Sequence, residues 1–188
     1  MKHKFGKLVL ASAMLISLQA CNNDDDTPEV INENEIISRV TLTLNGTQGD
    51  IVTLNSVDPD GDGPLAPTVT VSGDFNAGET YNGTIEFWND IADPHEDNTE
   101  EIREEKEHHQ IFFQQKGLGT ITYSDVDANN LPVGLSYKFV ASSTPAKGDL
   151  TVTLIHKPNK TGENVSNGDI TNAAGSTDAQ VTFPIVIK

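Results

Sequence analysis

The chain has a single cysteine, at position 21, and it is poor in basic and aromatic residues. Without a second cysteine no intramolecular disulfide can form, so packing or bound ions must stabilise the fold. Lys and Arg total 12 against 28 Asp and Glu, which gives a formal charge of −16. Such a surface repels phosphate groups, which argues against nucleic acid as a partner and favours the attraction of cations.

Motifs for catalysis are also lacking. The sequence has no G-x-S-x-G, no glycine loop that would cradle a phosphate, and no cysteine other than Cys21 to act as a nucleophile. We therefore expect no enzymatic activity. The abundant carboxylates leave a glycan-active hydrolase as a third hypothesis, because its pair of acids depends on a geometry that a sequence does not specify.

Residues 1–20 have the pattern of a secretory signal. Lys2, Lys4 and Lys7 precede an uncharged apolar run over residues 8–18, which is eleven residues long. A membrane-spanning helix needs about 20 residues, so the run predicts a signal peptide. Residues 18–21, Leu-Gln-Ala-Cys, resemble the lipobox of bacterial lipoproteins. That resemblance implies that Cys21 becomes the first mature residue and carries the lipid that anchors the protein to a membrane.

An acidic segment follows the cysteine. Residues 22–29, Asn-Asn-Asp-Asp-Asp-Thr-Pro-Glu, resemble the surface-export signal of Bacteroidetes-type lipoproteins. This resemblance implies a position on the outer face of the outer membrane, whereas the alternative is a solvated spacer. We expect residues 21–35 to be the lipidated cysteine and a flexible tether. Removing residues 1–20 leaves 168 residues with a charge of −19, because three lysines are lost.

Short runs of alternating apolar and polar residues fill residues 36–188. Period-two alternation with many Val, Ile and Thr residues is typical of half-buried strands, and no strand–helix–strand rhythm appears. The pattern predicts one all-β domain, an antiparallel two-layer, Ig-like sandwich of about nine strands. Pro184 predicts that the last strand lies at an edge or carries a bulge. The expected strands lie near residues 40–44, 50–57, 68–71, 81–87, 109–115, 118–125, 135–139, 150–154 and 181–187.

Two segments depart from this alternation. Residues 98–107 are rich in Glu and contain one apolar residue, Ile102, which predicts a short acidic helix on the surface, outside the core. Residues 158–178 are rich in Gly, Asn and Asp and join two strands. Long loops in compact domains are often functional, so we expect this one to form part of any binding site.

Two sets of residues are candidate metal ligands. Asp58, Asp60 and Asp62 alternate before a glycine, as in the opening of a Ca²⁺ loop, although the same residues also build tight turns. The second set combines the helix carboxylates of Glu101 and Glu105 with His109 and His156. Imidazoles with carboxylates suit a transition metal such as zinc or copper. A solvated acidic helix with incidental histidines is the alternative interpretation.

Trp88, the only tryptophan, is a possible ligand contact. It lies beside Asn89 and Asp90 at the end of an expected strand, where an indole ring can stack on a sugar. The alternative, which we favour, is that Trp88 fills the core of the sandwich, as a tryptophan does in many such folds.

Several later segments resemble a family of small Bacteroidetes lipoproteins. The segments are residues 99–105, 109–110, 122–127, 132–135 and 152–158. Such proteins are sometimes labelled "type 1 periplasmic binding fold", but this chain is too short for a two-lobed binding protein and lacks repeated βαβ units. The resemblance implies no specific activity. We expect a binding or structural accessory module at the cell surface with an envelope protein or glycan as partner, and a metal-binding lipoprotein is the alternative.

Overall fold

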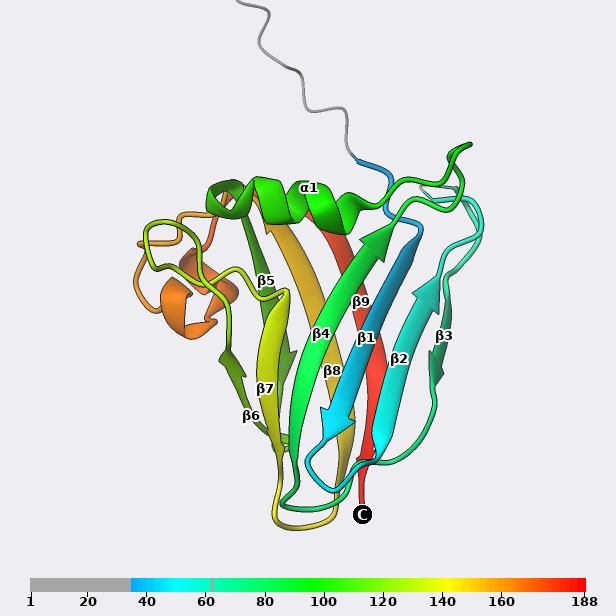
Figure 1. Ribbon diagram of the computed structural model, residues 1–188, viewed down its shortest axis with the longest axis vertical. Coiled ribbons are helices and arrows are strands. Elements are labelled where there is room, and N and C mark those ends of the chain that lie inside the picture. The colour runs from blue at the N-terminus through cyan, green and yellow to red at the C-terminus, as the bar shows by residue number, and fades with distance from the viewer. Residues whose placement is uncertain (1–34, 62) are drawn as a thin grey trace, which may run out of the picture. The chain divides into compact units, whose positions relative to one another are not determined.

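Two antiparallel β-sheets face one another and enclose the core (Figure 1). The computed structural model describes residues 35–61 and 63–188, so Cys21, Asp62, the signal and nearly all of the tether lie outside the described residues. Within that part of the chain, one sheet has the order β3-β2-β1-β4-β7-β6 and the other has the order β5-β8-β9. The strands are β1 (Arg39–Gly46), β2 (Ile51–Val57), β3 (Thr68–Val71), β4 (Thr80–Trp88), β5 (His109–Gln115), β6 (Gly119–Tyr123), β7 (Ser136–Ala141), β8 (Ala146–His156) and β9 (Ser176–Ile187). The predicted all-β sandwich is confirmed.

The alternating residues bury one face of each strand. In β1, Val40, Leu42 and Leu44 are buried, while the threonines between them are only partly buried. Leu154 in β8 and Phe183 in β9 are buried in the opposite layer and belong to the same core. Burying one large apolar side chain stabilises a fold by about 1.5–3 kcal/mol. Apolar packing between the sheets therefore takes the place of a covalent cross-link.

The acidic helix contributes to this core, contrary to expectation. Helix α1 (Asn98–Glu104) continues into a 3₁₀ turn, η1 (Lys106–His108), and crosses one end of both sheets (Figure 1). Ile102 is fully buried in the core. The Thr99 hydroxyl donates to the carbonyl of Phe87 and accepts from its N–H, at 3.0 and 2.9 Å. One apolar residue and one hydroxyl thus attach the helix across the end of the sandwich.

Strand β9 lies at the edge of the three-stranded sheet, as Pro184 predicts. Pro184 pairs in register with Asp149 of β8. A proline has no N–H to donate, which an edge strand tolerates where its outer side is unpaired. Residues 75–77 hydrogen-bond to the outer side of this chain end beyond Pro184, at residues 186 and 188.

The loop over residues 158–175 folds back on the outer face of the three-stranded sheet. It contains two 3₁₀ turns, η2 (Val165–Asn167) and η3 (Ile170–Asn172). Val165 and Ala173 from the loop bury Phe112 and Ile155 in a second, smaller apolar cluster. The Lys160 ammonium lies 3.0 Å from Asp127 Oδ2, and both side chains are almost completely buried. The loop is therefore held in place by packing and by an ion pair.

Candidate metal centre

Two histidines predicted as metal ligands lie opposite each other on neighbouring strands. His109 begins β5, His156 ends β8, and the antiparallel register pairs them directly. Their ring centroids are 4.8 Å apart. Ile111 and Leu154, each two residues away along its strand, belong to the core between the sheets. Because side chains two residues apart in a strand share a face, both imidazoles point into the space between the sheets.

A β-bulge in β9 brings a carboxylate to this histidine pair. Leu154 of β8 pairs with Ala179, whereas the next residue, Ile155, pairs with Thr177, so Asp178 is the extra residue. A bulge redirects the side chain that it carries. Asp178 Oδ2 lies 3.9 Å from His109 Nε2 and 3.8 Å from His156 Nδ1. The bulge therefore places Asp178 with the two histidines.

The three side chains have the composition and spacing of a metal site. Their ligand atoms all lie within 4.8 Å of one another, and no other such group of His, Cys, Asp or Glu occurs in the described residues. Donor atoms that each lie about 2.0–2.1 Å from a tetrahedral metal ion are about 3.4 Å from one another. The two distances to Asp178 are longer than this by only about 0.5 Å. Separations within the whole group reach up to 4.8 Å, so side-chain rotations that close gaps of as much as about 1.4 Å would bring all three donors onto one ion.

Hydrogen bonding determines which nitrogen of His109 is available. His109 Nδ1 lies 3.2 Å from the backbone carbonyl oxygen of Glu105. A carbonyl can only accept, so Nδ1 carries the proton and Nε2 of the neutral ring has a lone pair. Nε2 and Asp178 Oδ2 are both buried without a hydrogen-bond partner. Two acceptor atoms therefore face each other with no hydrogen between them.

Burial shifts the pKa of each group. The His109 side chain is 0% exposed, that of His156 is 8% and that of Asp178 is 5%. Loss of water lowers the pKa of both histidines, and the positive charge of nearby Lys157 lowers that of His156 further. The same desolvation raises the pKa of Asp178 to about 6. At pH 7 the site therefore holds two neutral imidazoles and one carboxylate, the protonation states that bind metals.

The helix carboxylates predicted as ligands are not part of this group. Glu105 contributes its backbone carbonyl to His109, but the side chains of Glu101 and Glu105 are both exposed. Both histidines were predicted as ligands from the sequence, but Asp178 was not. The signals that pointed to it were its place at the end of the loop expected to form part of a site and the Thr- and Val-rich strand that follows it.

Two aspartates of the predicted Ca²⁺ loop, Asp58 and Asp60, accept hydrogen bonds typical of a turn. Asp58 Oδ1 accepts from the N–H of Asp60, and Asp60 Oδ2 accepts from the N–H of Leu65. These contacts match the alternative interpretation, in which short acidic side chains build a turn. Asp62 lies outside the described residues.

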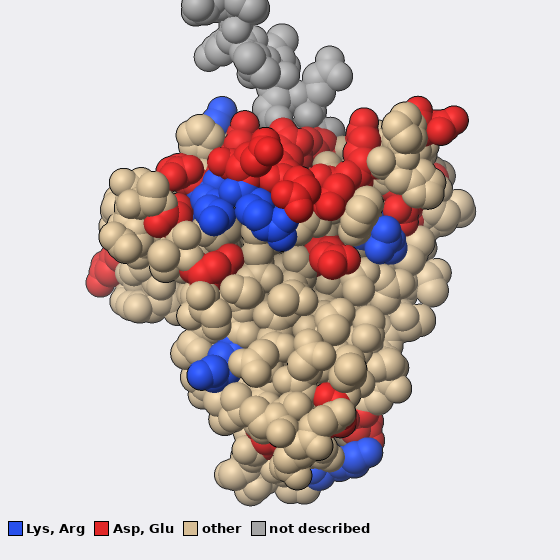
Figure 2. Space-filling model, viewed as in Figure 1, with Lys and Arg blue, Asp and Glu red and all other residues tan. Residues whose placement is uncertain are grey.

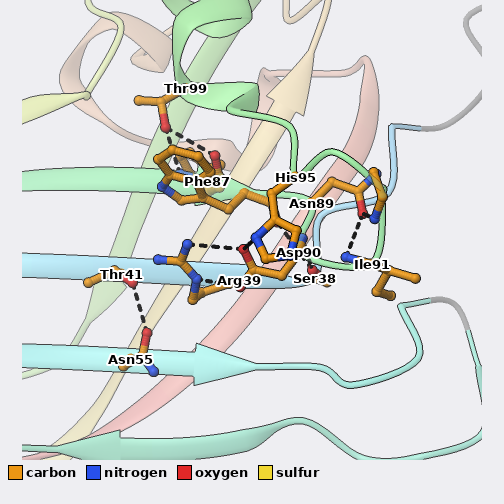
Figure 3. A network of polar contacts seen from close by, with 12 residues as sticks. Ser38, Arg39, Thr41, Asn55, Phe87, Asn89, Asp90, Ile91, His95 and Thr99 are labelled. Atoms are coloured by element: carbon orange, nitrogen blue, oxygen red, sulfur yellow. Dashed lines mark hydrogen bonds and ion pairs between the residues drawn. The ribbon is translucent and has the colours of Figure 1, made fainter.

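Trp88 does not fill the core. It is half-buried and follows the inward-facing Phe87, so its ring lies on the outer face of the six-stranded sheet. The Arg39 guanidinium carbon is 5.2 Å from the ring centroid. Arg39 also binds Asp90 through two nitrogens, at 2.6 and 3.1 Å, and His95 lies on the other side of that carboxylate (Figure 3). The preferred interpretation of Trp88 as a core residue was wrong.

The network around Asp90 fixes the start of β1. Ser38 Oγ accepts from the N–H of Asp90 at 2.7 Å, which joins the two segments shown in Figure 3. Hydrogen bonding to Arg39 lowers the pKa of Asp90, so that carboxylate stays ionised. These bonds hold Ser38 at the rim of a cavity that is partly open to solvent.

That cavity lies between the two sheets. It has a volume of about 200 Å³ and is lined by β1 and β2 with the loop after β2 on one side and residues 178–181 of β9 on the other. Asp178 belongs to its wall and to the histidine cluster. Asp and Glu side chains also gather at the end of the domain crossed by α1 (Figure 2). Both features place negative charge close to the cluster.

Comparisons of the chain with protein families, with curated proteins and with solved structures found no match. No helix in residues 35–61 and 63–188 has the length and apolar character needed to cross a membrane.

Proposed function

We propose that this protein is a lipid-anchored binding module of the bacterial cell surface whose ligand is a divalent transition-metal cation held by His109, His156 and Asp178. The observation that carries the proposal is the pair of buried acceptor atoms, His109 Nε2 and Asp178 Oδ2, that face each other at 3.9 Å. The location rests on the resemblance of residues 18–21 to a lipobox.

A cation resolves the electrostatic problem that these groups create. A buried carboxylate without a hydrogen-bond donor or an opposite charge is costly, and such groups are rare in native proteins. Two lone pairs aimed at the same space add repulsion. A metal ion between them accepts both lone pairs and neutralises the carboxylate, so the site becomes favourable only with the ion bound.

The donor set favours transition metals over calcium. Ca²⁺ takes six to eight oxygen ligands, whereas this cluster offers two nitrogens and a carboxylate. Imidazole suits zinc, copper, iron and nickel, and three protein ligands leave further coordination positions for water or another donor. The Glu105 carbonyl acts as the outer partner that orients a metal-binding histidine.

Titration calorimetry of the full chain in detergent tests this function. We expect saturable 1:1 heats with Zn²⁺, Co²⁺ or Cu²⁺, and none with Ca²⁺ at the same concentrations. His109→Ala should abolish the heat. His108→Ala removes a neighbouring exposed imidazole and is the matched control, with affinity expected to change less than twofold. Equal binding by His109→Ala and the wild type would refute the proposed site.

The anchor is tested separately. Cys21→Ser should move the protein from the detergent phase to the aqueous phase of a phase-separation assay, because several acyl chains are lost. Protease added to intact cells should digest the wild-type domain if it faces outward. A Cys21→Ser protein that stays with the membrane would place the anchor elsewhere.

A further inference from the structure

The cavity beside the candidate metal centre has its own chemical character. Ser38, Ser56 and Asp58 line one side of it, and Asp178 lines the other. Ser38 and Ser56 are both buried and both face the interior. Two carboxylate-bearing residues and two hydroxyl-bearing residues make a chamber that attracts cations and repels anions.

The size of the chamber restricts what it can hold. A cavity needs about 10–15 Å³ of such space to hold one water, so a volume of about 200 Å³ has room for several waters. A divalent ion with its octahedral shell of waters fits into that space. Organic ligands of drug size occupy cavities of about 300–1,000 Å³, so the chamber is smaller than a typical site for a metal enclosed by a large chelator.

Asp178 connects the chamber with the histidines. Asp178 is one of the residues that line the chamber, and its Oδ2 lies within 4 Å of a ring nitrogen of each imidazole. Asp178 Oδ2 and His109 Nε2 are both buried without a hydrogen-bond partner. A rotation of the Asp178 side chain would therefore carry a cation from the chamber to the imidazoles.

We infer that the chamber is the route by which a free, hydrated divalent transition-metal ion reaches the centre, with Asp178 the first ligand that the ion meets and the two histidines the next. This inference rests on the proposed metal-binding function and names the form of its ligand. It also assigns a role to Asp58, which the sequence marked as a candidate metal ligand and which lines the chamber.

Stopped-flow kinetics with Zn²⁺ separates the route from the site. Ser56→Leu places an aliphatic side chain in the chamber without replacing any of the three ligands. A blocked route slows association and dissociation equally, so we expect both rates to fall at least tenfold with an unchanged Kd. Ser56→Val introduces a smaller side chain and should slow both rates less. It tests the same route if the leucine variant does not fold.

A charge variant tests the same route without filling it. Asp58→Asn keeps the oxygen that accepts from Asp60 but removes the negative charge. We expect Zn²⁺ association to slow about two- to fivefold at low salt, with the difference shrinking as salt is added. Asp74→Asn removes an exposed carboxylate that pairs with Lys188 and should leave the rate unchanged.

A chelated metal tests the form of the ligand. With Zn²⁺ supplied as its nitrilotriacetate complex, transfer should be limited by release from the chelator and independent of protein concentration. A transfer rate that rises linearly with protein concentration would mean that the complex itself docks, and would overturn the inference.

The two proposals fail in different ways. If the wild type binds no transition metal, the proposed function is wrong. If it binds Zn²⁺ with the expected ligands but Ser56→Leu and Ser56→Val keep wild-type rates, only the route is wrong. Slower association in Glu101→Gln and Glu105→Gln, with Asp58→Asn unaffected, would move the route to the helix.

Discussion

Two buried ionisable clusters in this domain differ in how well their polar atoms are hydrogen-bonded. In the first, Lys160 Nζ lies 3.0 Å from Asp127 Oδ2 and also donates to the Lys106 carbonyl. Asp127 accepts two further bonds from the N–H groups of Asn129 and Leu131. In the second, His109 and Asp178 are equally buried, yet Nε2 and Oδ2 face each other at 3.9 Å without a donor.

The difference separates a cluster that stabilises the fold from one that is the candidate for binding a ligand. Burial favours a higher pKa for Asp127, but the bond from Leu131 and the ion pair with Lys160 outweigh it and lower the pKa. For Asp178, burial raises the pKa, and no hydrogen bond or ion pair offsets that rise. Unsatisfied buried groups persist where function requires them, at a cost in stability. The Lys160–Asp127 pair is therefore structural, and the histidine cluster is the functional candidate.

The largest effect is expected from breaking the structural pair. Lys160→Met leaves the buried Asp127 carboxylate without its counter-charge, so the free energy of unfolding should fall by about 3–5 kcal/mol. Urea denaturation followed by tryptophan fluorescence measures it. A loss below 1 kcal/mol would mean that the pair contributes as little as an exposed one, and would remove the contrast with the second cluster.

A bound metal should stabilise the second cluster. Zn²⁺ at one hundred times its Kd adds about 2.7 kcal/mol to the free energy of unfolding. In a domain of this size that corresponds to a rise in Tm of roughly 5–10 °C. Thermal melts with Zn²⁺ and with a chelator measure the shift, which should vanish in Asp178→Asn. An equal shift in that variant would exclude Asp178 as a ligand.

The same substitution should stabilise the metal-free protein. Burial raises the pKa of Asp178 to about 6 in the folded state from 3.8, so the folded state favours the protonated acid. Its contribution is fully present below pH 3.8 and is lost as the pH rises through 6, a change of up to about 3 kcal/mol. Asparagine does not titrate. With chelator at pH 7, Asp178→Asn should gain about 1–3 kcal/mol.

The pH profile distinguishes this cause from a packing effect. Below pH 4 the advantage of Asp178→Asn should disappear, since the wild-type carboxyl is then protonated in both states. A gain that is equal at pH 4 and pH 7 would contradict the role of desolvation.

The smallest effect is expected at an exposed pair. Lys188 Nζ and Asp74 Oδ2 are 3.7 Å apart, and both side chains are largely exposed. Lys188→Met should change the free energy of unfolding by less than about 1 kcal/mol, because solvent screens the charges. The same denaturation experiment measures this change. A loss as large as that of Lys160→Met would show that burial does not determine how much an ion pair contributes to stability.

The strands were predictable because alternation follows directly from burial of one face. The same alternation predicts the correct face for Trp88. Tyr81, Ile85 and Phe87 face the core, so the residue after Phe87 must face outward. The core contribution of α1 was not predictable from a pattern. Ile102 alone shows no periodicity, and its burial depends on where the helix crosses the sheets.

The candidate site was predictable only in part. His109 and His156 were named from their chemistry, but their direct pairing depends on the register of β5 and β8. Asp178 depends on a bulge between Leu154 and Ile155, which shifts the alternation of β9 by one residue. Strand register and bulges arise from contacts between distant segments, so a single sequence does not specify them.

X-ray absorption at the zinc edge of the loaded full chain identifies the donor atoms around the metal. If His109, His156 and Asp178 hold the zinc, the inner shell contains two imidazole nitrogens and carboxylate or water oxygens at about 2.0–2.1 Å. In His109→Ala the imidazole contribution should fall. An all-oxygen shell, or a spectrum that is unchanged in His109→Ala and Asp178→Asn, would show that the metal binds elsewhere.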